Sequence, residues 1–199
     1  MRTFAITWDY RCPFARNANE FVVDALLGGA DWDVTFVPFS LGQVHVADGE
    51  TPVWDRPADD SGLLALQVGT AVRDIDPQRF PDVHRDLFAL RHDLGGNLRD
   101  ADRLREIVTR HEVDAGAVFT HVADGRALKA VSEAHEAAAA EHDVWGVPTL
   151  ICGDRAVFVR LMHRSDGDAG TAAATVERLL DLMDGFVDLN EFKHTRIPR

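Results

Sequence analysis

The sequence predicts an α/β fold with a helical insertion, and three observations lead to that prediction. Residues 3 to 39 read as strand, helix and strand, the pattern of a parallel sheet. The long stretch that follows the loop at residues 49–60 shows helical periodicity and no strand periodicity up to residue 143. Residues 149 to 160 then predict a β-hairpin, and a helix follows it. We therefore expect residues 1–58 and 144–199 to form one domain, with 59–143 inserted into it.

The opening unit can be justified residue by residue. Residues 3–8 are apolar, β-branched or aromatic, as in a strand, and a turn over residues 9–13 ends it. Pro13 suits the first position of a helix, and apolar residues recur at helical spacing from there to Gly28. Cys12 then falls at the helix N-cap. The second strand covers residues 34–39, and Pro38 indicates that it ends at the margin of the sheet.

The rest of the chain is organised by turn and capping signals. A Pro- and Asp-rich loop covers residues 49–60, and we expect Asp59 and Asp60 to lie on the solvated surface. A Gly153-Asp154 turn joins the two arms of the hairpin. Periodicity and caps place the remaining helices at about residues 63–72, 83–94, 100–108, 125–143 and 168–185.

Composition and charge restrict the class of partner. The chain of 199 residues has 21 Lys and Arg against 33 Asp and Glu, a net charge of −12. Phosphate binding needs clustered basic residues, so we expect no nucleic-acid partner and no membrane association. The first apolar run is too short for a signal sequence or a membrane span. We expect a cytoplasmic protein whose two cysteines, Cys12 and Cys152, are free thiols.

Cys12 is the residue that best fits a chemical role. A helix N-terminus carries about half a positive charge and free N–H donors, which stabilise a thiolate and lower its pKa. We expect the amides of Phe14 and Ala15 to supply those donors, and Arg11 and Arg16 to reinforce the field if they face the sulfur. The alternative is a buried cysteine that behaves as a small hydrophobic residue.

Several segments carry a family resemblance. They are Trp8-Asp9-Tyr10-Arg11-Cys12-Pro13, Phe39-Ser40-Leu41, Trp145-Gly146-Val147-Pro148-Thr149 and Glu191-Phe192-Lys193-His194-Thr195-Arg196. With the order of elements, they resemble the DsbA family of thioredoxin-fold proteins, and more narrowly the actinobacterial branch that includes mycothiol-dependent nitroreductases. The resemblance implies a thioredoxin fold with a cis peptide bond before Pro148, packed beside the Cys12 sulfur. It also implies that the backbone of Val147 is free to pair with a bound thiol or peptide.

The sequence departs from the dithiol members of that family. Ala15 stands where the second cysteine of Cys-x-x-Cys would be, so Cys12 has no local partner for a disulfide. We take Ala15 as the natural residue, the alternative being an engineered trap for an intermediate. Cys152 lies four residues beyond Pro148, about 13 Å along an extended strand, and a disulfide needs Cα atoms within about 6.8 Å. We therefore interpret Cys152 as a residue of the strand core.

A lone thiol supports chemistry when the resolving thiol comes from outside. The sequence therefore favours an oxidoreductase that uses one cysteine and a small thiol co-substrate, mycothiol or glutathione, with an electrophile or disulfide as substrate. A thiol-dependent isomerase or transferase, and a non-catalytic thioredoxin-like binding protein, remain alternatives. Besides the catalytic Cys12, the candidate thiol- and substrate-binding residues are Tyr10, Arg11, Pro13, Phe14, Ala15, Trp145, Val147, Pro148 and Thr149.

Other cofactors have no motif. The chain contains no His-x3-His or Cys-x2-Cys pair that would chelate zinc, so we expect no metal. It also lacks Gly-x-Gly-x-x-Gly and a Walker loop, so we expect no tightly bound nucleotide. The Pro-rich loop at residues 51–57 and the polar tail each suit a contact in a homodimer.

Overall fold

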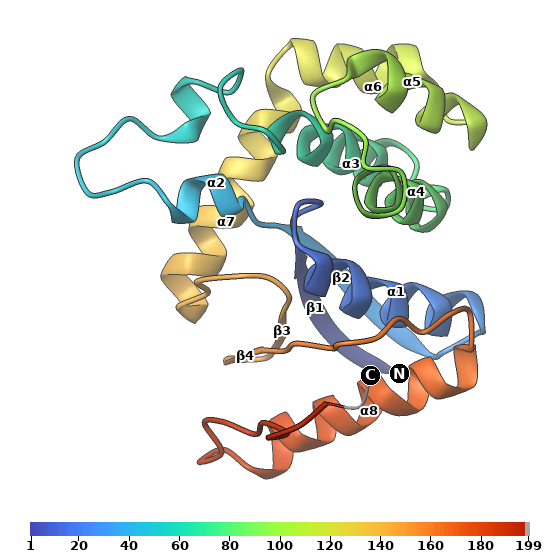
Figure 1. The fold of residues 1–199 in the computed structure, drawn as a ribbon, viewed down its shortest axis with the longest axis vertical. Helices are drawn as coiled ribbons and strands as arrows, with labels where there is room; N and C mark the ends of the chain where they lie inside the picture. Colours follow the sequence, from blue (N-terminus) through green and yellow to red (C-terminus); the bar gives the residue numbers. More distant parts are fainter. Residues whose placement is uncertain (198–199) are drawn as a thin grey trace.

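The computed structural model describes residues 1–197, and its four strands form one sheet in the order β2-β1-β3-β4 (Figure 1). β1 (Arg2–Trp8) and β2 (Trp32–Pro38) run parallel, with Ile6 opposite Phe36, and α1 (Pro13–Leu27) connects them. The predicted strand–helix–strand unit is confirmed. β2 lies at the edge of the sheet. A proline is tolerated there because its missing N–H removes no hydrogen bond from the centre of the sheet.

The hairpin closes the other side of the sheet. β3 (Thr149–Cys152) pairs antiparallel with β1 and with β4 (Arg155–Phe158), and Gly153 in the turn has a φ of 59°. A positive φ at this position suits glycine because it has no Cβ. The second arm was predicted over residues 156–160, but β4 begins one residue earlier, at Arg155, and ends two residues earlier, at Phe158.

The helical insertion lies between β2 and β3, as predicted. Its helices are α3 (Leu63–Ile75), α4 (Phe80–His92), α5 (Ala101–Arg110), α6 (Ala115–Ala123) and α7 (Arg126–His142). Figure 1 shows α3 to α6 grouped beyond the carboxyl end of β1 and β2, while α7 runs back from them towards the sheet. This arrangement places the insertion over the β1–α1 connection that contains Cys12.

Helix boundaries show two further differences from the prediction. α4 ends at His92 instead of near Gly95, because Gly95 has a left-handed φ of 63° and the Gly96 N–H bonds back to the Leu90 carbonyl at 2.7 Å. The sequence did not predict three short elements, which are α2 (Leu41–Val44), the 3-10 turn at Val53–Asp55 and α6. The nine-residue α6 is too short to show a strong periodicity.

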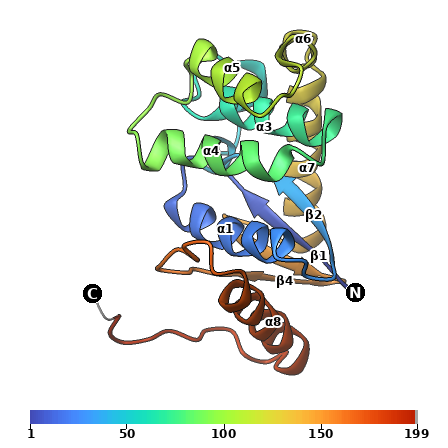
Figure 2. The ribbon, with the colours of Figure 1, turned by 90° about the vertical axis from the view of Figure 1, so that its right-hand side faces the viewer.

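The last helix, α8 (Ala169–Gly185), is capped by Asp168 as predicted, and its side chain accepts the Thr171 N–H at 2.9 Å. Figure 2 shows α1 between α8 on one side and α4 on the other. α8 buries Ala172, Val176 and Leu180. Contacts to both helices fix α1, and with it the position of Cys12 at its N-terminus.

Asp60 corrects the expectation of a solvated surface. Its carboxylate side chain is only 6% exposed and pairs with Arg11 at 2.9 Å. It also accepts the N–H groups of Gly62 and Leu63, each at 2.8 Å. Asp59 is exposed, as expected. Within residues 1–197, no helix has the length and apolar character needed to cross a membrane.

Candidate active site

Cys12 caps the N-terminus of α1, as predicted. Its N–H bonds to the Asp9 carbonyl at 3.0 Å, which closes the turn after β1, and Pro13 begins the helix. The Sγ atom accepts the backbone N–H of Ala15 at 3.4 Å. The sulfur therefore lies at the N-terminal end of α1, where the N–H groups have no partner within the helix.

The loop before β3 lies against the same sulfur. The Val147–Pro148 peptide bond is cis, and the Cys12 thiol donates to the Val147 carbonyl with an Sγ–O distance of 3.4 Å. Thr149 holds this loop: its N–H bonds to Thr7 Oγ1 and its hydroxyl donates to the Gly146 carbonyl, both at 2.8 Å. The expected cis bond beside the sulfur is confirmed.

The thiol is less acidic than the sequence led us to expect. Cys12 is only 9% exposed, and this burial raises the pKa of its thiol. The N–H groups of Ala15 and Phe14 act in the opposite direction, Asp9 adds to the rise, and Arg160 lowers the pKa. Because burial dominates, the prediction of a lowered pKa is wrong. The raised pKa favours the thiol form, and this is the form that donates to the Val147 carbonyl.

The two arginines expected to support the thiolate are neutralised by carboxylates. Arg11 pairs with the fully buried Asp9 at 2.6 Å, and with Asp60. Arg16 pairs with Glu20 at 3.0 Å and with Asp93 at 2.5 Å. Arg11 is thus held in the β1–α1 loop by two carboxylates.

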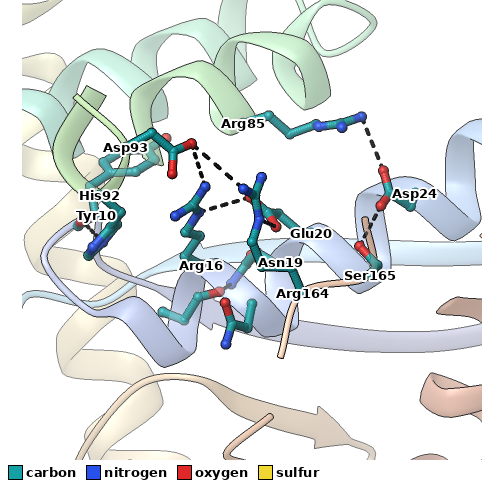
Figure 3. Close-up of polar contacts among 12 residues, drawn as sticks. Tyr10, Arg16, Asn19, Glu20, Asp24, Arg85, His92, Asp93, Arg164 and Ser165 are labelled. Atoms are coloured by element: carbon teal, nitrogen blue, oxygen red, sulfur yellow. Dashed lines mark hydrogen bonds and ion pairs between the residues drawn. The ribbon is translucent and has the colours of Figure 1, made fainter. Parts of the chain in front are cut away.

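Figure 3 shows that Arg16 belongs to a network along α1. Glu20, buried at the centre, also accepts two bonds from Arg164, at 2.7 and 2.9 Å. One turn further, Asp24 pairs with Arg85 at 3.1 Å and accepts the hydroxyl of Ser165. These carboxylates connect α1 to α4 and to the segment after β4.

Tyr10 is fully buried, so it does not line the ligand surface as predicted. It supports the site through hydrogen bonds. Its hydroxyl donates to Nδ1 of His84 at 2.8 Å, and Nε2 of His84 donates to Asn19 Oδ1 at 3.1 Å. Asn19 in turn donates to the carbonyls of Thr7 and Ala15. Burial lowers the pKa of His84 to about 3, so this imidazole is neutral. The network connects β1, α1 and α4 beneath the sulfur.

The structure adds two residues that the sequence did not indicate. Phe158 stacks on Trp145 with ring centroids 4.5 Å apart, and the Arg160 guanidinium lies 4.7 Å from the Phe14 ring centroid. Phe158 and Arg160 are two positions apart along an extended segment, which puts both on one side. This spacing in the sequence could have indicated that the two side chains act together. It indicates this site only when β4 is known to lie near Pro148.

Cys152 is half-buried, and its Sγ lies 3.7 Å from the Thr3 carbonyl, near the start of β1. Cys12 follows the opposite end of that strand, and both cysteines are free thiols. Within the described residues, no group of three or more His, Cys, Asp or Glu side chains is arranged to hold a metal ion.

The model of the DSBA-like thioredoxin domain matches residues 5–164, which is most of the chain. The chain belongs to this family. The fold is therefore a DsbA-like thioredoxin fold with a helical insertion, α3 to α7, as the resemblance implied. No curated protein shows significant sequence similarity to this chain.

Solved structures share the fold at low sequence identity. The thiol-disulfide exchange protein α-DsbA2 from Wolbachia pipientis is 18% identical, with a TM-score of 0.59 over 89% of this chain and 81% of the other. A 2-hydroxychromene-2-carboxylate isomerase is 15% identical, with a TM-score of 0.62 over 94% and 99%. The cytosolic disulfide reductase DsbM from Pseudomonas aeruginosa, in a structure with GSH, is 16% identical, with a TM-score of 0.60 over 90% and 100%.

Proposed function

We propose that this protein is a thiol-dependent oxidoreductase that uses Cys12 as its single nucleophile and a low-molecular-weight thiol as its resolving partner. One observation carries the proposal: Cys12 Sγ lies between the Ala15 N–H and the Val147 carbonyl, 3.4 Å from each, at the start of α1. Because residue 15 is alanine and Cys152 lies near the opposite end of β1, the second thiol of a catalytic cycle has to come from another molecule.

The cycle consists of two exchange steps. The Cys12 thiolate attacks one sulfur of a disulfide, a new S–S bond forms, and the other sulfur leaves as a thiolate with the electron pair. A small-molecule thiolate then attacks the substrate-derived sulfur of the mixed disulfide, and Cys12 leaves as the thiolate. The proton lost by the Cys12 thiol passes to solvent, and the N–H groups of Phe14 and Ala15 stabilise the charge.

The backbone next to the sulfur suits a bound thiol. Within residues 1–197, the N–H of Val147 has no hydrogen-bond partner, and this residue contacts the Cys12 sulfur through its carbonyl. A cysteinyl thiol bound in extended form would satisfy that N–H. The similarity to DsbM, whose structure contains GSH, supports a glutathione-like thiol. The resemblance to the actinobacterial branch favours mycothiol.

A second candidate is a thiol-dependent isomerase or transferase. The buried, protonated Cys12 favours it, because such an enzyme binds a small thiol without forming a disulfide to the protein. The similarity to 2-hydroxychromene-2-carboxylate isomerase extends over 94% of this chain.

Intact-mass measurement after incubation with oxidised mycothiol or glutathione separates these candidates. We expect one added thiol on the wild type, the same addition on Cys152→Ser, and none on Cys12→Ser. Tight binding of the reduced thiol without an adduct would overturn the redox proposal in favour of the isomerase. Absence of both binding and adduct would favour a non-catalytic protein.

The pH dependence of the reaction follows from the raised pKa of Cys12. We expect the rate of adduct formation to keep rising with pH beyond about 8.5, the usual pKa of a free thiol, because the thiolate fraction is still increasing there. A rate that levels off near neutral pH would show that the sulfur is ionised in the resting protein.

A further inference from the structure

Three aromatic rings, from α1, from the loop before β3 and from β4, lie together beside Cys12. We call Phe14, Trp145 and Phe158 the aromatic platform. Phe158 stacks on Trp145 at 4.5 Å, and the Arg160 guanidinium lies over the rings of Phe14 and Phe158, 4.7 and 5.6 Å from their centroids. Trp145 is 64% exposed. Exposed aromatic surface next to a nucleophilic sulfur is typical of a binding site.

Short connections fix the platform around the sulfur. Phe14 is the second residue after Cys12, and its N–H points to the sulfur. Trp145 lies two residues before Val147, whose carbonyl accepts the Cys12 thiol. The segment between Phe158 and Arg160 is tied to the same loop, because the Val159 N–H bonds to the Pro148 carbonyl at 3.0 Å.

Arg160 differs from the other arginines near Cys12. Arg11 and Arg16 each pair with two carboxylates, whereas no carboxylate within residues 1–197 lies within 4.0 Å of the exposed Arg160 guanidinium. Asp9, the acidic group that acts on the sulfur, is already paired with Arg11. The chain has a net charge of −12, yet among its described residues no carboxylate pairs with this cation at the site. An anion on the ligand would supply a counter-ion.

We infer that the substrate that reacts at Cys12 carries a planar, conjugated group with a negative charge, its ring stacked on the aromatic platform and its anion at Arg160. An aryl carboxylate has this chemistry. The inference rests on the proposed function, since it takes Cys12 as the reacting atom. With an aryl disulfide, the Cys12 thiolate bonds to one aryl sulfur while the other leaves as an aryl thiolate with the electron pair, and the Cys12 proton goes to solvent.

Three disulfide probes test the inference. Dithiobis-nitrobenzoate is aromatic and anionic, dithiodipyridine is aromatic and neutral, and bis-hydroxyethyl disulfide is aliphatic and neutral. Each rate is measured on Cys152→Ser protein, so that only Cys12 reacts, and is divided by the rate of the same probe with a free small thiol. This division removes the intrinsic reactivity of each probe.

We expect Arg160→Gln to lower the rate ratio of the anionic to the neutral aromatic probe by about fivefold, equivalent to about 1 kcal/mol for an exposed charge pair. Because a change in the pKa of Cys12 alters the rates of all probes by the same factor, it does not change the ratio of the anionic to the neutral aromatic probe. Arg178→Gln removes the same charge from an exposed position of α8 and should leave the ratio unchanged. Arg160→Lys should recover part of the preference.

The ring contribution is tested by Trp145→Leu. This change should slow both aromatic probes relative to the aliphatic one, with the charge preference retained. The inference is overturned if Arg160→Gln leaves the ratio at the wild-type value, or if both aromatic probes keep their wild-type rates in Trp145→Leu. If Cys12 reacts with none of the three probes, it is the proposed function that fails.

Discussion

Protonation of His84 is expected to make the fold sensitive to mild acid. The imidazole is fully buried between Tyr10 and Asn19, and burial lowers its pKa to about 3, from about 6.5 in an unfolded chain. Between these two pH values the unfolded state binds a proton that the folded state does not. The stabilisation is therefore complete above about pH 6.5 and is lost as the pH falls towards 3.

The size of the effect follows from the pKa difference. One unbalanced proton changes the free energy of unfolding by about 1.4 kcal/mol per pH unit, so a shift from pH 7 to 5 removes about 2 kcal/mol through His84 alone. For a chain of this length, that lowers the Tm by about 4–8 °C. Burial also lowers the pKa of His135, to about 4, and that of His92, so both act in the same direction.

Urea unfolding at pH 7 and pH 5 isolates the contribution of His84. His84→Gln keeps a hydrogen-bonding side chain but does not titrate, so its loss of stability between the two pH values should be about 2 kcal/mol smaller than that of the wild type. His45→Gln, which replaces an exposed histidine, is the matched control. An equal loss in wild type and His84→Gln would refute the reasoning, because it would mean that His84 binds protons equally in both states.

Three substitutions test other contacts by thermal and urea unfolding. Tyr10→Phe leaves Nδ1 of His84 without its donor and should cost about 2 kcal/mol; an unchanged Tm would show that the hydroxyl bond contributes nothing. Glu20→Gln removes the buried carboxylate shared by Arg16 and Arg164 and should lower the free energy of unfolding by about 3 kcal/mol. A variant as stable as the wild type would contradict this expectation. Gly69→Ala places a Cβ 2.2 Å from the Tyr10 hydroxyl oxygen, so we expect it to destabilise the fold, and a neutral result would mean that Tyr10 moves freely.

Local sequence signals predicted the caps and turns correctly but did not predict every helix. The caps at Asp100 and Asp168, Pro13 at the start of α1 and the Gly153-Asp154 turn are each confirmed, because each depends on neighbours within a few residues. α6 was missed although Asp114 caps it, since nine residues give too little periodicity to recognise.

By itself, the sequence determined the order of the four strands and of the longer helices, the position of Cys12 at a helix N-terminus and the absence of a second cysteine beside it. Only the tertiary structure decided the surroundings of that sulfur. The burial that raises its pKa, the pairing of Arg11 and Arg16 with carboxylates and the approach of Arg160 all depend on segments far apart in the chain. Desolvation and charge pairing depend on distances in space, which spacing along the sequence does not specify.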